Sequence, residues 1–380
     1  MSVVVAGGGL AGQRCVETLR RGGYDGPITM VCSEVHRPYD RPPLSKTALT
    51  GADAHRPTGL RPERWYGEQS VELLLGVAAA GLDARRRELR LADGGRLGYE
   101  HLLIATGGRP RRLGLLDGFS NVSTLRNLED AHEIRAALEA GGPLAIVGAG
   151  FIGQEVAAAA REVGVPAAVI EVEALPLARV LGDELGSWLR DLHVGEGVEM
   201  FLGSGVSAVR GGERVESLVL TDGREIPCGH VVVGIGVAPD VEWLAGSGLP
   251  TSGVPADVDG RTELPGVYAA GDAAATFEPA LGRRITGAHW ESAGRQGARA
   301  AKAMLGLDPG PAVTSSFWSD LYGTRIQYLG HASLADELSI DGDPTGRDFT
   351  ATFTRAGRPV AALLVGRPRQ LPQARALLSA

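Results

Sequence analysis

The chain has 380 residues, of which 44% are hydrophobic and 22% charged, and its formal net charge is −7. This length favours about two or three domains, and the acidic balance argues against non-specific binding of nucleic acid. No apolar run approaches the roughly 20 residues that cross a bilayer, and the opening MSVVVAGGG does not have the pattern of a signal peptide, so we expect no membrane contact and a cytoplasmic location.

The first predicted strand, Val3–Ala6, leads into the pattern Gly7-x-Gly9-x-x-Gly12, and a helix is predicted over Gly12–Arg21. In such a turn the second glycine lets the backbone approach a pyrophosphate, whose charge the helix N-terminus favours. The next strand, Ile28–Val31, is followed by Glu34, 22 residues after Gly12. A carboxylate at this distance accepts hydrogen bonds from ribose hydroxyls, so the segment predicts a dinucleotide site.

The same arrangement recurs later in the chain. A strand at Leu144–Val147 precedes Gly148, Gly150 and Gly153, a helix is predicted over Phe151–Val163, and the strand Ala167–Glu171 ends in an acid 18 residues after Gly153. A glutamate at the ribose edge repels a 2′-phosphate, so Glu171 favours NADH over NADPH. Arg179 is the first cation after it, and we expect it to contact adenosine or a phosphate.

A second repeat supports duplication of a whole domain. Leu89–Gly107 and Leu218–Gly236 each contain an alternating strand, an Asp-Gly turn, a return strand and an apolar strand that ends in glycine. The apolar strands are predicted at His101–Ala105 and Val231–Gly234. Two such signatures in the same order indicate two related nucleotide-binding domains with parallel sheets.

The remaining elements give the predicted domain organisation. A helix is expected over Asn127–Ala140, and the strand Val267–Ala270 and the helix Trp290–Leu305 follow the second copy. The last two have no counterpart in a minimal nucleotide domain, so we expect them to complete the first copy. The predicted fold class is α/β, with two Rossmann-like (glutathione-reductase-type) domains and a small C-terminal α+β domain. The predicted ranges are 1–110 with 235–312, 111–234, and 313–380.

Three cysteines, Cys15, Cys32 and Cys228, form no C-x-x-C pair and no metal-binding spacing. Each falls on or beside a predicted core element, so we expect buried, unreactive thiols. Their odd number suits a reducing compartment, and we expect no metal site.

Seven motifs carry a resemblance to a known family: GGGLAG, YDRPPLSK, ATGGRPR, LRNLEDA, GAGFIGQE, AAGD and FWSD. In this order they resemble the FAD-dependent ferredoxin–NAD(P)+ reductases of oxygenase systems, the branch of putidaredoxin reductase and of the reductases of aromatic-ring dioxygenases. YDRPPLSK followed by FWSD is the most specific part of the resemblance. It implies that the first domain holds FAD and the second NADH, while the third shapes the flavin site and helps to dock the partner.

The resemblance also implies roles for single residues. A lysine–glutamate pair beside the flavin corresponds to Lys46 and Glu155, which would otherwise read as a solvated lysine and a charge favoured by a helix dipole. Trp290 and Trp318 would flank the flavin ring, although either would also suit a core. The residues assigned to FAD are Gly7, Gly9, Ala11, Gly12, Glu34, Arg41, Lys46, Ala79, Ala105, Thr106, Gly107, Arg126, Gly271, Asp272, Trp290 and Trp318. Those assigned to NAD are Gly148, Gly150, Ile152, Gly153, Glu171, Arg179 and Gly236.

NADH donates a hydride and a ferredoxin accepts single electrons, and a flavin exchanges both. The resemblance therefore implies an NADH-dependent reductase of an iron–sulfur ferredoxin that feeds an oxygenase, either a haem monooxygenase or a ring-hydroxylating dioxygenase. One alternative is an NADH oxidase, peroxidase or disulfide reductase on the same scaffold, which usually carries a redox cysteine near the flavin. The other is a redox-sensing flavoprotein like the apoptosis-inducing factors, which usually carry long insertions and targeting segments.

Overall fold

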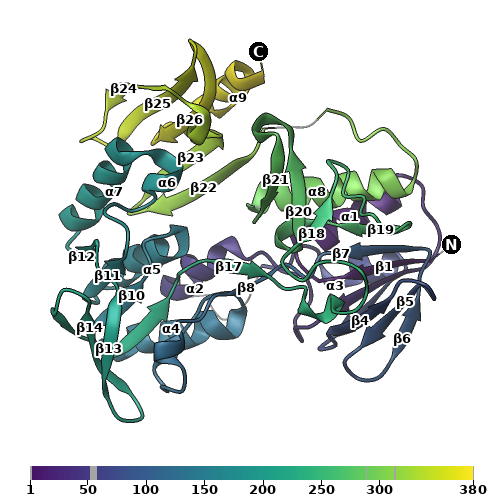
Figure 1. Ribbon diagram of the computed structural model, residues 1–380, viewed down its shortest axis with the longest axis horizontal. Helices are drawn as coiled ribbons and strands as arrows, with labels where there is room; N and C mark the ends of the chain where they lie inside the picture. Colours follow the sequence, from purple (N-terminus) through teal and green to yellow (C-terminus); the bar gives the residue numbers. More distant parts are fainter. Residues whose placement is uncertain (1, 52–57, 288, 312–313, 380) are drawn as a thin grey trace. The chain divides into compact units, whose positions relative to one another are not determined.

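The computed structural model describes residues 2–51, 58–287, 289–311 and 314–379 (Figure 1). The chain divides into two compact units. Unit 1 contains residues 1–40, 58–109 and 237–315, and unit 2 contains residues 41–57, 110–236 and 316–380. The grouping differs from the three predicted domains in two segments. Residues 41–57 were predicted in the first domain and residues 316–380 in a third, and both belong to unit 2. The predicted boundary at residues 312–313 lies outside the described residues.

Unit 1 is built on a five-stranded parallel sheet in the order β19-β7-β1-β2-β3. Its strands are β1 (Val3–Ala6), β2 (Ile28–Cys32), β3 (Val71–Leu75), β7 (His101–Ile104) and β19 (Val267–Ala269). Its helices are α1 (Leu10–Arg21), α3 (Glu63–Glu68) and α8 (Trp290–Met304). The unit also contains the antiparallel strands β4 (Ala79–Asp83), β5 (Glu88–Leu91) and β6 (Arg96–Gly98), and the sheet β18 (Val254–Ala256), β20 (Ala274–Glu278) and β21 (Arg283–Thr286).

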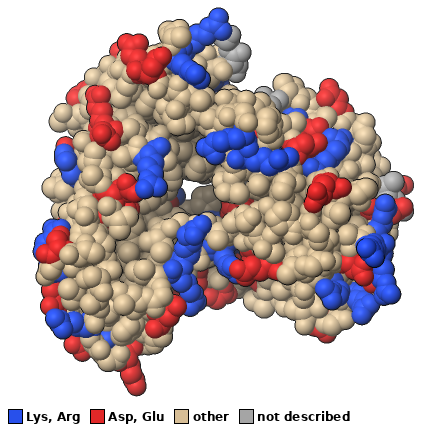
Figure 2. Space-filling model, in the orientation of Figure 1, with Lys and Arg blue, Asp and Glu red and all other residues tan. Residues whose placement is uncertain are grey.

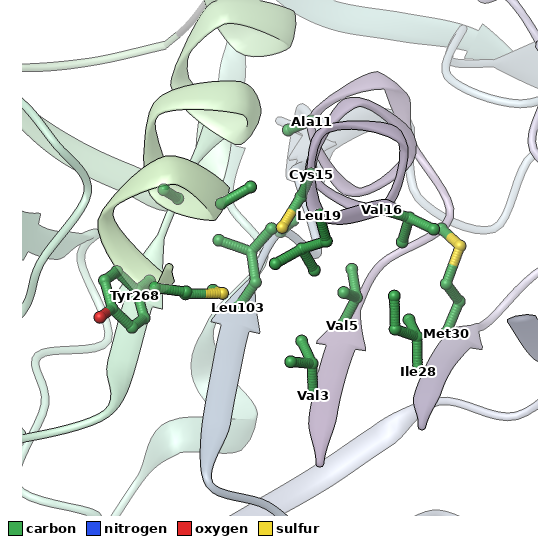
Figure 3. Packing of buried hydrophobic residues seen from close by; sticks show 14 of the residues in the cluster. Val3, Val5, Ala11, Cys15, Val16, Leu19, Ile28, Met30, Leu103 and Tyr268 are labelled. Carbon is green, nitrogen blue, oxygen red and sulfur yellow. The ribbon is translucent and has the colours of Figure 1, made fainter. Parts of the chain in front are cut away.

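Both faces of the unit 1 sheet are buried, which explains the continuous apolar strands. Val3 and Val5 belong to the cluster formed with α1 and α8, whereas Val4 and Ala6 belong to a cluster with the β4–β6 strands. Figure 3 shows Cys15, Val16 and Leu19 of α1 directed toward these strands. The two helices pack tightly, since a Cβ on Gly297 of α8 would lie 2.0 Å from the carbonyl oxygen of Ala11. Close packing of apolar side chains therefore holds α1, and with it the first glycine turn, on the sheet.

Unit 2 repeats this plan with a parallel sheet in the order β12-β11-β10-β16-β9. Its strands are β9 (Val122–Ser123), β10 (Leu144–Val147), β11 (Ala167–Glu171), β12 (Glu199–Leu202) and β16 (His230–Val233). Its helices are α2 (Thr47–Thr50), α4 (Leu128–Ala140), α5 (Phe151–Glu162), α6 (Ala178–Leu181) and α7 (Asp183–Gly195). The second antiparallel meander is β13 (Val206–Gly211), β14 (Val215–Leu220) and β15 (Glu225–Pro227).

The C-terminal part of unit 2 is an antiparallel sheet in the order β22-β23-β26-β25-β24, followed by a helix. Its elements are β22 (Ser316–Leu321), β23 (Thr324–Gly330), β24 (Glu337–Asp343), β25 (Asp348–Arg355), β26 (Arg358–Val365) and α9 (Leu371–Ser379). One face shares a core with α5, α6 and α7, where Phe317 packs 4.4 Å from Phe151 between ring centroids and Trp188 packs 5.1 Å from Phe349. The predicted fold class, two Rossmann-like domains with a small α+β domain, is confirmed.

Candidate functional site

Each glycine turn ends at a helix whose first N–H groups have no side-chain cap. Gly9 is the N-cap of α1 and Gly150 the N-cap of α5, both with extended backbone. Within the described residues, neither helix has a side-chain cap bond or an acidic residue in its first turn. Uncapped N–H groups and the helix dipole together favour an anion such as a diphosphate.

The glycines of each turn have two distinct roles. A Cβ on Gly12 would lie 2.2 Å from the Gly7 carbonyl oxygen, and one on Gly153 would lie 2.0 Å from that of Gly148. These contacts leave no room for a side chain between turn and helix. By contrast, a Cβ on Gly9 would meet no atom within 4 Å, and one on Gly150 would meet only the Gly234 carbonyl oxygen, at 3.7 Å. The open space in front of an uncapped helix fits the diphosphate of a dinucleotide in both turns.

The two predicted acids lie at the ends of the second strands. Glu34 follows β2, is half-buried and accepts a hydrogen bond from the Tyr39 hydroxyl at 2.5 Å. Glu171 ends β11, and its Oε2 accepts a hydrogen bond from the Ala149 N–H at 2.7 Å, inside the second glycine turn. Its Oε1 accepts one from the Glu173 N–H at 3.0 Å. Glu171 is thus bonded directly to the turn that it was predicted to accompany.

Arg179, predicted to contact adenosine or a phosphate, lies on α6. Its guanidinium forms an ion pair with Glu173, and its side chain is 81% exposed. Ile152 lies in the first turn of α5. Gly236 has a φ of 103° and accepts a hydrogen bond from the Arg111 N–H at 2.9 Å.

Lys46 and Glu155 form a buried ion pair in unit 2. Lys46 Nζ lies 2.7 Å from Glu155 Oε1, and the two side chains are only 18% and 7% exposed. The Ser319 hydroxyl donates to the same carboxylate oxygen at 2.7 Å, and the Ser45 hydroxyl donates to Oε2. The ammonium also donates to the Pro42 carbonyl at 3.3 Å. The Glu155 carboxylate thus has three donors, and Lys46 is paired and largely buried, so the solvated-lysine interpretation of Lys46 is wrong.

The partners Ser45 and Ser319 are absent from the predicted site residues. Ser45 precedes Lys46 in YDRPPLSK, and Ser319 is the serine of FWSD on β22. Both motifs were recognised, but nothing in the local pattern shows that they converge on α5. The same segment carries Arg41, whose Nη1 donates to the Arg126 carbonyl at 2.6 Å. The Arg126 N–H in turn donates to Asp130 at 2.7 Å.

Most residues assigned to FAD lie in unit 1. The Thr106 hydroxyl donates to the Asp240 carbonyl at 2.6 Å, and the Trp290 indole N–H donates to Asp40 at 2.6 Å. The Gly271 N–H donates to Gln296 at 2.8 Å, next to Asp272. Ala79 begins β4, Ala11 lies on α1, and Ala105 and Gly107 follow β7. Trp318 belongs to unit 2, on β22, with the Arg325 guanidinium 5.9 Å from its ring centroid.

The three cysteines are free and buried. Burial raises the pKa of Cys32 to about 12 and that of Cys228 to about 11, and it raises the pKa of Cys15 further. Since the thiolate is the reactive form of cysteine, these raised pKa values disfavour reaction at neutral pH. The predicted burial of the three thiols is confirmed. Among the described residues, no cluster of three or more metal-ligating side chains is present, and no helix is long and apolar enough to cross a membrane.

Comparison with known proteins agrees with this geometry. Residues 1–297 match the pyridine nucleotide-disulphide oxidoreductase family, and residues 316–380 match the reductase C-terminal family. The ferredoxin–NAD(+) reductase component of the anthranilate 1,2-dioxygenase system of Burkholderia cepacia is 37% identical over 380 residues, which cover 99% of this chain and 94% of that protein.

Two solved structures extend the comparison. The covalent putidaredoxin reductase–putidaredoxin complex matches with a TM-score of 0.94 at 30% identity, over 99% of this chain and 92% of that chain. The ferredoxin reductase for the CYP199A2 system of Rhodopseudomonas palustris has a TM-score of 0.91 at 34% identity, over 96% and 91%. The resemblance inferred from the motifs is confirmed. The chain belongs to the pyridine nucleotide-disulphide oxidoreductase family and is an oxidoreductase that uses FAD and NAD(H).

Proposed function

We propose that the protein is an NADH-dependent ferredoxin reductase that supplies single electrons to an iron–sulfur ferredoxin serving an oxygenase. The observation that carries this proposal is the combination of two uncapped glycine turns, each with its acid, and the buried Lys46–Glu155 pair. The relative from Burkholderia cepacia and the putidaredoxin complex are named for this activity, which supports the same assignment here.

The two units divide the binding tasks. Unit 1 holds FAD, with its diphosphate on the N-terminus of α1, its ribose on Glu34 and its ribityl hydroxyls on Asp272. Unit 2 holds NADH, with its diphosphate on the N-terminus of α5 and its ribose on Glu171. FAD, when bound, converts a hydride into single electrons. The Lys46–Glu155 ion pair of unit 2 corresponds to the lysine–glutamate pair of the resembling reductases.

The buried thiols favour this function over a thiol-dependent one. A disulfide reductase or peroxidase of this family type needs a reactive cysteine, and the pKa of each thiol here is raised by burial. Free thiols also support a cytoplasmic location. We therefore expect electrons to leave the flavin directly for an external acceptor.

Added salt should slow the ferredoxin reaction and leave flavin reduction by NADH almost unchanged. Exposed arginines such as Arg283, Arg284 and Arg111 offer local contacts for an acidic iron–sulfur protein, and Figure 2 shows basic and acidic side chains alternating in small groups over the face in view. Such contacts between exposed charges are screened over about 8 to 10 Å at 0.1–0.15 M salt. The measurement compares NADH oxidation with a ferredoxin and with oxygen as acceptor. Faster turnover with oxygen would instead support the NADH oxidase alternative.

NADH should be preferred to NADPH. Glu171→Ala should narrow this preference, because it weakens the binding of NADH and relieves the repulsion of the 2′-phosphate of NADPH. The structure adds a second effect, because the variant also loses the hydrogen bond from the Ala149 N–H. Glu199→Ala, which removes an exposed carboxylate at the start of β12, is the matched control. The measurement is stopped-flow reduction of the flavin at several concentrations of each cofactor. Equal rates of flavin reduction with NADH and NADPH in the wild type would show that Glu171 does not select between the two cofactors.

A further inference from the structure

We propose that Gln154, His193 and Tyr322 form a hydrogen-bonded relay that positions the second glycine turn for NADH. This inference rests on the proposed NADH site and deepens it, because it assigns positioning residues to that site. Tyr322 belongs to the C-terminal sheet region. Through this residue, a segment that is far from the second glycine turn in the sequence contributes to cofactor binding.

The relay consists of three consecutive hydrogen bonds. Gln154 Nε2 donates to the Ala149 carbonyl at 2.9 Å, and Gln154 Oε1 lies 3.1 Å from His193 Nε2. His193 Nδ1 lies 2.6 Å from the Tyr322 hydroxyl. Since the Gln154 oxygen can only accept, His193 Nε2 carries the proton, and Nδ1 accepts from Tyr322. The donors then follow one direction along the relay, from Tyr322 to His193, from His193 to Gln154 and from Gln154 to the Ala149 carbonyl.

Burial makes the relay costly to break. Gln154 and His193 are 1% and 0% exposed. Burial lowers the pKa of His193 to about 4, so its ring is neutral at pH 7 and keeps one donor and one acceptor. A buried polar group that loses its hydrogen-bond partner destabilises the structure. The arrangement therefore resists rotation of the Ala149 carbonyl.

The anchored carbonyl sets the direction of a donor in the turn. The Ala149 carbonyl and the Gly150 N–H belong to one planar peptide and point in opposite directions when it is trans. No cis peptide bond occurs in the described chain. Gln154 thus aims the Gly150 N–H away from itself, while Glu171 holds the Ala149 N–H at 2.7 Å. Both peptides that flank Ala149 are fixed before a ligand arrives.

The first glycine turn provides an internal comparison. Gln13 occupies the position equivalent to Gln154, directly after the third glycine. Its Nε2 donates to Glu17 at 3.1 Å, and its Oε1 accepts from the Tyr66 hydroxyl at 2.8 Å. The same residue type therefore bonds to its own helix in unit 1 and to the glycine turn in unit 2.

Tyr322 reaches His193 from a tight turn between β22 and β23. Its φ of 52° is a left-handed conformation that costs a non-glycine residue free energy. The Arg347 guanidinium lies 6.0 Å from its ring centroid, and Arg347 also pairs with Glu196 near the end of α7. The turn and the Arg347 guanidinium thus hold the Tyr322 hydroxyl beside His193.

The test is a calorimetric measurement of ADP-ribose binding, because this ligand probes the second glycine turn without involving the chemistry of the flavin. Tyr322→Phe is expected to weaken binding about 3- to 10-fold, and His193→Leu at least as much. His193→Gln, whose amide N–H can still reach Gln154, should recover part of the affinity. Tyr66→Phe removes the equivalent hydroxyl in unit 1 and should leave the dissociation constant unchanged. With ferricyanide as acceptor, Tyr322→Phe should raise the KM for NADH and keep kcat.

An unchanged dissociation constant in Tyr322→Phe, in a protein with wild-type circular dichroism, would overturn the relay. The same conclusion follows if Tyr66→Phe weakens ADP-ribose as much as Tyr322→Phe does. If the His193→Leu protein does not fold, the dissociation constant of Tyr322→Phe by itself tests the relay. A wild-type protein that fails to bind ADP-ribose would instead overturn the proposed NADH site.

Discussion

A Gly150→Asp protein is expected to fold, to keep its FAD and to bind NADH roughly 100- to 1,000-fold more weakly than the wild type. A Cβ at this position would meet only the Gly234 carbonyl oxygen, at 3.7 Å, and the backbone φ is −73°. Aspartate is a favoured N-cap, so it would bond to the same N–H groups that a diphosphate needs. Its charge, about 4 Å from a phosphate, adds repulsion of about 4 kcal/mol at an effective dielectric constant of 20.

Two further variants make this result specific. Gly150→Asn fills the same N-cap without a charge and should weaken NADH less than Gly150→Asp. Gly9→Asp makes the equivalent change in unit 1, where a Cβ would meet no atom within 4 Å, and should yield a folded protein without FAD. Stopped-flow titration with NADH and the flavin absorbance measure both effects. A Gly150→Asp protein that is reduced at wild-type NADH concentrations would show that NADH does not use this turn.

Lys46→Met is expected to slow flavin reduction by NADH by roughly 10- to 100-fold, an effect of about 1.4 to 2.7 kcal/mol on the barrier. Without the ammonium, the buried Glu155 carboxylate keeps only the donors Ser45 and Ser319 and lacks a compensating positive charge. Glu155→Gln has the opposite effect on charge, because Lys46 then lacks its counter-ion. We therefore expect a higher flavin midpoint potential in Glu155→Gln, since an uncompensated cation favours the reduced, more negative flavin.

The double variant Lys46→Met/Glu155→Gln removes both charges and should return the potential toward the wild-type value. Half-buried Lys302, near the end of α8, provides the control Lys302→Met. Anaerobic redox titration and stopped-flow spectroscopy give the two readouts, and thermal unfolding reports the fold. Wild-type rates and potentials in both single variants would make the pair a structural feature only.

The parallel sheets and their helices follow closely from local patterns. The strands at Val3, Leu144 and Ala167 begin and end as predicted, because a buried apolar run bounded by glycine leaves little freedom. The helix α4 also begins where its sequence indicates, since Asn127 and Asp130 form a capping box at its start. The two glycine turns were also predicted correctly, because only glycine fits at Gly12 and Gly153.

Long-range contacts could not be predicted from such patterns. Residues 41–57 group with unit 2, although they lie between segments of unit 1, and no local feature of YDRPPLSK indicates this. Ser319 reaches Glu155 across 164 positions, and Tyr322 reaches His193 across 129. The hairpin of β20 and β21 was also missed, because its turn has no Asp-Gly pair and depends on Gly282 in a left-handed conformation. Tertiary packing decides these contacts, and a single sequence does not display it.

The most direct test of the proposed electron path is the number of ferredoxin molecules reduced per NADH under anaerobic conditions, in a variant without thiols. Cys15, Cys32 and Cys228 are replaced by alanine, since all three are buried. A hydride carries two electrons and a ferredoxin accepts one, so we predict about two reduced ferredoxins per NADH, at a rate close to that of the wild type. A variant whose bound FAD is still reduced by NADH but passes no electrons to ferredoxin would contradict the account, because a thiol would then carry them.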